Sequence, residues 1–167
     1  VGVINADTIL NFPDFRSSER TYQMLSQVSG RAGRGNIKGD VIIQTFNPDN
    51  YSIELSKTHN YVDFFNKEIK IRKDLKYPPY YFISLIKIGS KDYNLSLSES
   101  KKIANYIKEN ISEDMIVLGP SVSGVSRVNK IYYFQIIIKF RNKEKMREIL
   151  NNVSDLENNN KVSISID

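Results

Sequence analysis

Residues 76–81 read KYPPYY, and this stretch decides how the chain is divided. The adjacent prolines, Pro78 and Pro79, cannot continue a helix, and they favour an extended backbone at Tyr77. A helix is therefore expected to end before this stretch, and a second unit to begin after it. The domains that follow from this boundary are residues 1–77 and residues 78–167.

The segments after the boundary follow the order strand, helix, strand, strand, helix, strand. Ser96 and Glu99 match a capping box for the first helix, and Asn142 can cap the second. The strand patterns cover residues 80–88, 116–119 with 123–128, 131–140 and 161–166. This order, with the helices on one face of an antiparallel sheet, predicts an α+β ferredoxin-like βαββαβ domain.

The segments before the boundary have a different pattern. Residues 1–5 (VGVIN) and 39–46 (GDVIIQTF) are apolar runs that predict buried strands of a larger, mostly parallel α/β sheet. Between them, Ser17 or Ser18 can cap a helix that carries an apolar face and stops at Gly30.

A further helix is expected to open at Asn60 and Asp63 and to run to about residue 75. Its expected core face consists of Tyr61, Phe64, Phe65 and Ile69.

The composition limits the kinds of site that the chain can hold. Cysteine is absent and His59 is the one histidine, which excludes disulfides, thiolate metal sites and His-rich metal sites. The apolar runs are too short to cross a membrane, and the first residues lack the basic flank of a signal peptide. The net charge of +5 favours an anionic partner such as nucleic acid. Because the chain starts without Met inside an apparent strand, we expect it to be a piece of a longer protein.

An arginine pair stands in SQVSGRAGRG, residues 26–35. Arg31 and Arg34 are bracketed by glycines, which let backbone approach a ligand while the guanidinium groups bind phosphate oxygens. These glycines are Gly30, Gly33 and Gly35. The alternative is that arginines just past a helix end only interact with the helix dipole.

The run from Gln27 to Arg34 resembles motif VI of superfamily-two helicases, Q-x-x-G-R-x-G-R. The longer segment NADTILNFPDFRSSERTYQMLSQVSGRAGRGNIKGDVIIQT (5–45), with YVDFFNKEIKIRKDLKYPPY (61–80) and VLGP (117–120), resembles the primosomal protein N′ family of bacterial replication-restart helicases. The resemblance is densest from residue 5 to residue 80 and thinner from 121 onward.

The resemblance implies that residues 1–77 are the end of a RecA-like helicase lobe two. It implies that Arg31 and Arg34 are catalytic arginine fingers toward ATP, with Gln27, Gly30, Gly33 and Asp7 on the nucleotide-binding side. For Asp7 the alternative is a carboxylate that caps the next loop. Because the chain has no G-x-x-x-x-G-K-[ST] phosphate loop, the ATP and Mg sites would be completed upstream, and the chain alone is expected to be inactive. The family's zinc site would also lie upstream, so no metal site is expected here.

The resemblance also implies partners for the whole protein: forked and single-stranded DNA, single-stranded DNA-binding protein and other primosome proteins, in the bacterial cytoplasm at the nucleoid, with 3′-to-5′ helicase polarity and no membrane. Cutting a parallel sheet leaves an unpaired edge. The isolated chain is therefore expected to self-associate through residues 1–46.

A second candidate site follows the strand at 131–140. Alternation places Tyr132, Phe134, Ile136, Ile138 and Phe140 toward the core. Near this strand a set of cationic, aromatic and polar residues suits single-stranded nucleic acid or an acidic protein tail. The set consists of Arg127, Lys130, Tyr133, Gln135 and Lys139. The alternative is a solvated or intramolecular docking face. Two other functions remain open for the chain: a non-catalytic binding scaffold and a small-ligand regulatory domain.

Overall fold

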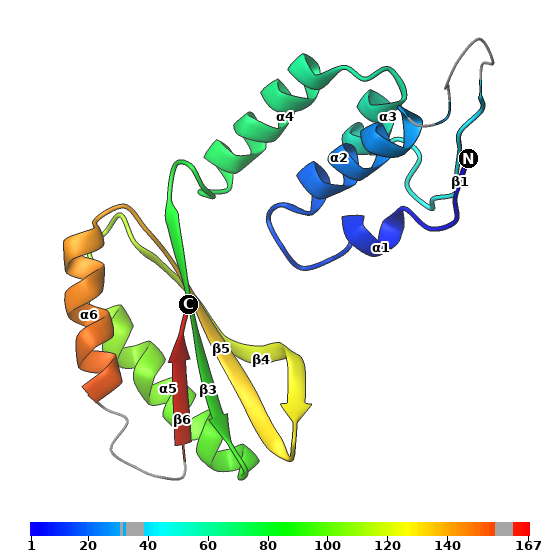
Figure 1. Ribbon diagram of the computed structural model, residues 1–167. Coiled ribbons are helices and arrows are strands. Elements are labelled where there is room, and N and C mark those ends of the chain that lie inside the picture. The colour runs from blue at the N-terminus through cyan, green and yellow to red at the C-terminus, as the bar shows by residue number, and fades with distance from the viewer. Residues whose placement is uncertain (31, 33–38, 156–161) are drawn as a thin grey trace. The chain divides into compact units, whose positions relative to one another are not determined.

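The computed structural model of the chain describes residues 1–30, 32, 39–155 and 162–167 (Figure 1). The described residues form two compact units, Val1–Leu75 and Lys76–Asp167. This division lies two residues before the boundary expected from the prolines. Whether the two units are separate domains stays a prediction.

The first unit is mainly helical. Its elements are β1 (Gly2–Val3), α1 (Asp7–Leu10), α2 (Ser17–Ser29), β2 (Ile42–Ile43), α3 (Tyr51–Lys57) and α4 (Tyr61–Asp74). The two short strands pair in parallel, with Gly2 opposite Ile42. Only two residues of each strand pair, and Gly2 and Ile42 are exposed. The expectation that residues 1–5 and 39–46 form buried strands is therefore wrong for the described residues. A small core forms instead from Ala6, Leu25 and Ile53.

The two long helices of this unit test the expected caps. Ser17 does not cap α2; its hydroxyl lies within hydrogen-bonding distance of the carbonyl oxygens of Phe12 and Asp14, and Arg16 occupies the cap position. The end of α2 at Ser29, with Gly30 as its cap, confirms the expected stop. Asn60 caps α4 as expected, because its side-chain oxygen accepts from the backbone N–H of Asp63 at 3.2 Å.

The core face expected for α4 is partly wrong. Phe64 is buried, and its ring stacks on Tyr22 of α2 with the ring centroids 4.2 Å apart. Tyr61 and Phe65, by contrast, are 61% and 46% exposed. The face of α4 that packs within this unit therefore includes Phe64 but leaves Tyr61 and Phe65 largely exposed.

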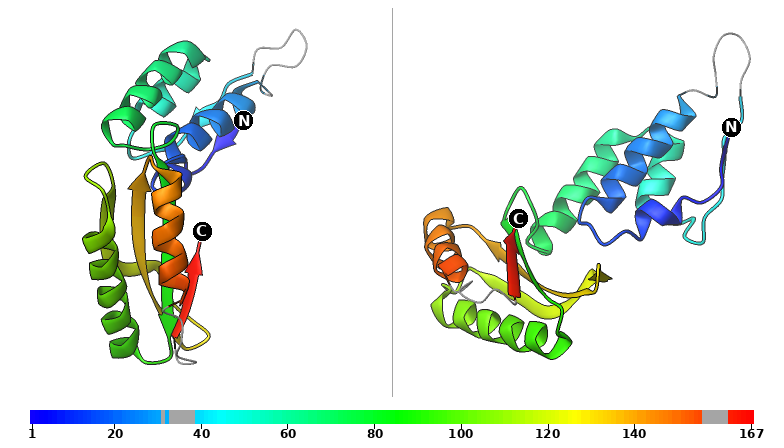
Figure 2. Two further views of the ribbon diagram at one scale, coloured as in Figure 1. Left: turned by 90° about the vertical axis from the view of Figure 1, so that its left-hand side faces the viewer. Right: turned by 60° about the horizontal axis from the view of Figure 1, so that its bottom comes forward.

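The second unit is a four-stranded antiparallel sheet with two helices. Its elements are β3 (Phe82–Ser90), α5 (Tyr93–Asn110), β4 (Ile116–Val128), β5 (Ile131–Phe140), α6 (Lys143–Asp155) and β6 (Val162–Ile166). The strand order is β4-β5-β3-β6. Both helices cover one face of the sheet (Figure 2). The core between them is built on Ile86, Ile88, Ile136 and Ile138 of the central strands, packed with Ile107 and Ile149 among others.

The first residues of the two helices in this unit test the caps that the sequence predicted. Asn142 caps α6 as expected, accepting from the backbone N–H of Lys145 at 3.0 Å. The capping box of Ser96 and Glu99 is wrong, because α5 begins earlier, at Tyr93, with Asp92 as its cap. Ser96 is buried inside the helix, and its hydroxyl lies within hydrogen-bonding distance of two strand carbonyl oxygens, those of Ile88 and Tyr132.

Strand β4 is irregular at the expected kink. Its register against β5 shifts between Leu118 and Ser121, on either side of Gly119 and Pro120. Gly119 has a φ of +104°, and a Cβ there would lie 2.8 Å from the carbonyl oxygen of Gln135, so only glycine suits this position. Asn129 and Lys130, both with positive φ, then make the two-residue turn into β5.

Candidate nucleotide and nucleic-acid sites

The motif VI residues begin on the last turns of α2. Gln27 and Gly30 are exposed there, and Ala32 follows with its N–H donating to the carbonyl of Ser29 at 3.2 Å. Arg31, Gly33 and Arg34 lie outside the described residues. Their roles toward ATP therefore stay predictions.

A network of side chains anchors the other end of α2 to α4. Arg72 of α4 donates from Nη2 to Glu19 of α2 and from Nε to Glu68 of α4, each at 2.7 Å. The hydroxyl of Tyr51 completes the network by donating to Glu68 at 2.5 Å. Burial and this hydrogen bond to a carboxylate raise the pKa of Tyr51 to about 12. The first turn of the motif VI helix is thus fixed to α4 by charge-assisted hydrogen bonds.

A groove of about 770 Å³ runs between α2 and α4. Gln27 lines it on the α2 side, and the exposed rings of Tyr61 and Phe65 line it on the α4 side. The hydroxyl of Ser26, also in its lining, is buried without a hydrogen-bond partner among the described residues. The groove places one motif VI side chain beside aromatic rings, a feature that the sequence pattern did not predict.

Asp7 is buried and is the first residue of α1. Its carboxylate accepts from the N–H of Phe46 at 2.9 Å, from the hydroxyl of Thr45 at 3.0 Å and from the amide of Asn47 at 3.1 Å. The N–H of Phe46 contributes most to lowering the pKa of Asp7 below its usual value. These contacts match the loop-capping alternative, and the nucleotide-side role of Asp7 stays a prediction.

The residues expected near the β4–β5 hairpin do not share one face. Tyr133 and Gln135 point away from the helices, opposite Gly89 and Lys87 in the register of the sheet. Arg127 pairs with Tyr132 on the helix-covered face, with its guanidinium carbon 4.8 Å from that ring's centroid. The reason is the second register shift of β4, between Val122 and Arg127, which changes the face of the sheet on which Arg127 lies. Lys130 is exposed in the turn.

Lys139 lies at the other end of β5, away from the hairpin turn. It is only 7% exposed, and its Nζ lies 3.6 Å from the centroid of the Tyr77 ring. Burial, and then the positive charge of Lys76, lower the pKa of Lys139. A binding role for Lys139 stays a prediction, and it is separate from the hairpin.

The comparisons with known proteins now bear on these sites. Residues 73–167 match a family model described as the primosomal protein N C-terminal domain. The chain belongs to this family. The resemblance seen in the sequence is thereby confirmed, and it extends upstream of the family model, because the relatives described next align with most of the chain.

Three relatives, each named replication restart protein PriA, illustrate the match. The protein of Bacillus subtilis is 42% identical over 92% of this chain and 19% of its own length. That of Synechocystis is 40% identical over 84% of this chain and 17% of its own length. That of Borreliella burgdorferi is 34% identical over 93% of this chain and 24% of its own length. The chain therefore spans about a fifth of the length of these primosomal relatives.

Other comparisons add little. A solved structure of a de novo designed protein, Foldit4, covers 51% of this chain and 93% of its own, with 16% identity and a TM-score of 0.39, too slight a likeness to support a conclusion. Within the described ranges, no group of three or more His, Cys, Asp or Glu residues is placed to hold a metal ion. In the same part of the chain, no helix is long and apolar enough to cross a membrane.

Proposed function

We propose that this chain is the end of helicase lobe two and the C-terminal domain of an ATP-dependent 3′-to-5′ DNA helicase that restarts bacterial replication and assembles the primosome. The observation that carries the proposal is membership of the primosomal protein N family together with the motif VI sequence at the end of α2. The relatives' name, replication restart protein, supports the cellular role.

In this proposal α2 presents the arginine fingers to an ATP cleft. Bound ATP, with Mg, supplies the phosphoryl group whose transfer to water drives unwinding. Arg31 and Arg34 neutralise negative charge on that group, and Gln27, Gly30 and Gly33 shape the backbone and polar contacts beside it. Such a finger accelerates hydrolysis by about a thousandfold or more.

The residues present fit one side of such a cleft. Gln27 is exposed at the end of a helix whose first turn is fixed by Arg72. The chain has no phosphate loop, so the remaining ATP and Mg contacts come from upstream sequence, as does the family's zinc site. The chain alone is therefore proposed to hydrolyse no ATP.

The fold supports different roles for the two units. The parallel pairing of β1 and β2 beside α2 is consistent with the edge of a RecA-like lobe. The strand order β4-β5-β3-β6, with both helices on one face, supports a ferredoxin-like domain. We assign catalysis to the first and partner binding to the second.

The second unit's binding surface is proposed at the hairpin end of the sheet, where Lys130, Tyr133 and Gln135 lie. It would contact forked or single-stranded DNA, or single-stranded DNA-binding protein, in the bacterial cytoplasm at the nucleoid. Self-association through residues 1–46 also remains proposed for the isolated chain. The exposure of Ile4 and Phe46, 81% and 88%, supports it.

An unwinding assay tests the proposal. The intact protein that carries this segment should separate a fork in the presence of ATP only when it can load on a 3′ single-stranded tail. Arg31→Ala should lose unwinding yet bind the fork as the wild type does, because the finger acts on nucleotide. Arg20→Ala, an arginine on the same helix paired with Asp14, is the matched control and should unwind normally.

A binding scaffold without catalysis is the second candidate, favoured by the cationic and aromatic residues of the second unit. It predicts fork binding with no ATP-dependent unwinding by the wild type or by either variant. Unwinding of both tail polarities would contradict the proposed direction.

A further inference from the structure

Arg72 of α4 lies where it can set the direction of α2, the helix that leads into motif VI. Its guanidinium group donates from Nη2 to Glu19 and from Nε to Glu68. Its Cζ lies 5.2 Å from the ring centroid of Phe15. Glu19 is in the first turn of α2, and Phe15 is in the loop before that helix. One side chain of α4 therefore contacts both the start of α2 and the segment that leads into it.

The position of Arg72 on α4 is itself fixed. Its side chain is 13% exposed, and that of its partner Glu68, one turn earlier in α4, is 9% exposed. The hydroxyl of Tyr51 in α3 donates to the same Glu68. Because the planar guanidinium group donates to two carboxylates from different nitrogens, its orientation is determined. We call the contact between Arg72 and Glu19 the Arg72–Glu19 link.

The link joins two helices that run in opposite directions (Figure 1). Glu19, in the first turn of α2, meets Arg72 near the end of α4. Tyr22, further along α2, stacks on Phe64, which comes earlier in α4. The motif VI end of α2 therefore lies toward the start of α4, away from the link.

The motif VI end of α2 has no comparable attachment to α4. The groove between the helices is lined there by Ser26 and Gln27, and the hydroxyl of Ser26 is buried without a hydrogen-bond partner. Among the described residues, no hydrogen bond or ion pair joins residues 23–29 to α4. Polar contacts thus fix α2 to α4 at its first turn, while the groove leaves room for the other end to move.

The length of α2 amplifies a small change at its first turn. From Glu19 to Ser29 the helix rises about 15 Å, because each residue adds about 1.5 Å. A rotation of about 10° about the first turn would therefore move the last turn by about 2–3 Å. A displacement of about 1 Å of a group that acts on the reacting atoms can lower a rate about a hundredfold.

Stability gives only a partial reason for the link. The side chain of Glu19 is 37% exposed, and ion pairs with an exposed partner contribute little to stability. The packing of α2 is supplied by Thr21, Tyr22 and Leu25, which are buried. The main consequence of the link is therefore the direction of α2 relative to α4.

We propose that Arg72 and Glu19 are positioning residues for the arginine fingers, because their link sets the direction of α2 and with it the place at which motif VI meets the nucleotide. The inference rests on the function proposed above, and it adds to motif VI a residue of another helix. Arg72 and Glu19 act through Arg31 and Arg34 and do not themselves contact ATP.

The test is DNA-stimulated ATP hydrolysis by the intact protein at saturating fork DNA, measured as kcat and as KM for ATP. Glu19→Ala should lower kcat about tenfold or more and leave KM within about twofold, because a displaced finger loses an interaction made in the transition state. Glu19→Gln keeps a side-chain oxygen that can accept from Arg72 and should retain most of the wild-type kcat.

A matched control separates the link from general effects of charge. Glu54 is likewise an exposed acid in the first turn of a helix, α3, so Glu54→Ala removes the same charge and the same interaction with a helix dipole. Glu54→Ala should keep the wild-type kcat.

A second variant removes the link from the side of α4. Arg72→Met combined with Glu68→Gln leaves no unpaired carboxylate on α4, and it should lower kcat as Glu19→Ala does. Adding Glu19→Ala to this pair should lower kcat no further, because all three substitutions act through one contact. Circular dichroism and urea unfolding check that each variant is folded at the assay temperature.

The outcomes distinguish this inference from the proposed function. A wild-type kcat for Glu19→Ala, or an equal loss in Glu54→Ala, would overturn the positioning role, and loss of hydrolysis in Arg34→Ala would still support the fingers. A raised KM with unchanged kcat in Glu19→Ala would assign Glu19 to nucleotide binding and also overturn that role. Hydrolysis by Arg34→Ala at the wild-type rate would overturn both proposals.

Discussion

Asp7 shows how one side chain fixes a loop that is distant in sequence. Its carboxylate accepts three hydrogen bonds from residues 45–47, which are 38 to 40 positions away. The resemblance to the helicase family pointed to Asp7, but nothing in the neighbouring sequence indicates its partners. These contacts support the capping role, and the sequence could not predict them because they join residues that are far apart along the chain.

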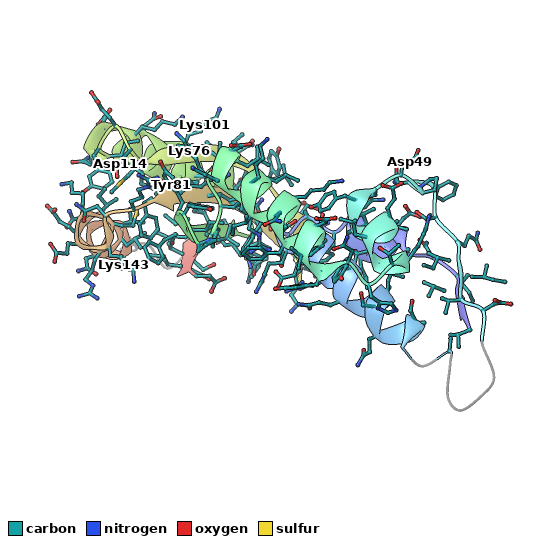
Figure 3. The ribbon with its side chains drawn as sticks, turned by 90° about the horizontal axis from the view of Figure 1, so that it is seen from above. Asp49, Lys76, Tyr81, Lys101, Asp114 and Lys143 are labelled. Carbon is teal, nitrogen blue, oxygen red and sulfur yellow. The ribbon has the colours of Figure 1, made fainter. Side chains whose placement is uncertain are left out.

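The lowered pKa of Asp7 makes a prediction about acid stability. Its ionised form is favoured in the folded state, so its stabilising contribution is present above the ordinary aspartate pKa of about 3.9 and is lost as pH falls through the lower folded pKa. Asp7→Asn should therefore flatten the dependence of urea-unfolding stability on pH below about 5. Asp49→Asn, at an exposed position labelled in Figure 3, is the control. An Asp7→Asn variant with the full acid dependence of the wild type would refute this role.

At the scale of elements, some of the local capping signals predicted the helix starts and others did not. Asn60 and Asn142 cap their helices because each bonds a backbone N–H three residues ahead, which sequence spacing can indicate. Ser96 lies in an equally suggestive pattern, yet its hydroxyl contacts strand carbonyls instead. Helix α3 was not predicted at all, although Asn50 caps it by accepting from the N–H of Ser52.

The contact between α2 and α4 predicts a stability effect. Glu68 has a side chain only 9% exposed, so removing Arg72 leaves a nearly buried carboxylate without its cation. Arg72→Met should lower the free energy of unfolding by about 2–3 kcal/mol. Adding Glu68→Gln should restore part of that loss, because the two substitutions are coupled. Urea denaturation measures both, and Arg20→Ala, which breaks a more exposed pair with Asp14, should cost less than about 1 kcal/mol. Additive losses in the double variant would contradict the coupling.

At the scale of the whole molecule, the family could be predicted from the sequence because its motifs are contiguous along the chain. The residues of the binding surface could not be predicted from the sequence, because they depend on the register of the strands. A register shift in β4 places Arg127 on the helix-covered face of the sheet, and Lys139 is buried.

The central claim is that α2 delivers arginine fingers to an ATP cleft, and DNA-stimulated ATP hydrolysis tests it most directly. The measurement compares intact wild-type protein with its Arg34→Ala and Arg20→Ala variants at saturating fork DNA. We predict that Arg34→Ala loses about a thousandfold or more in kcat with its DNA affinity unchanged, while Arg20→Ala keeps the wild-type rate. Hydrolysis by the Arg34→Ala enzyme at the wild-type rate would contradict the claim.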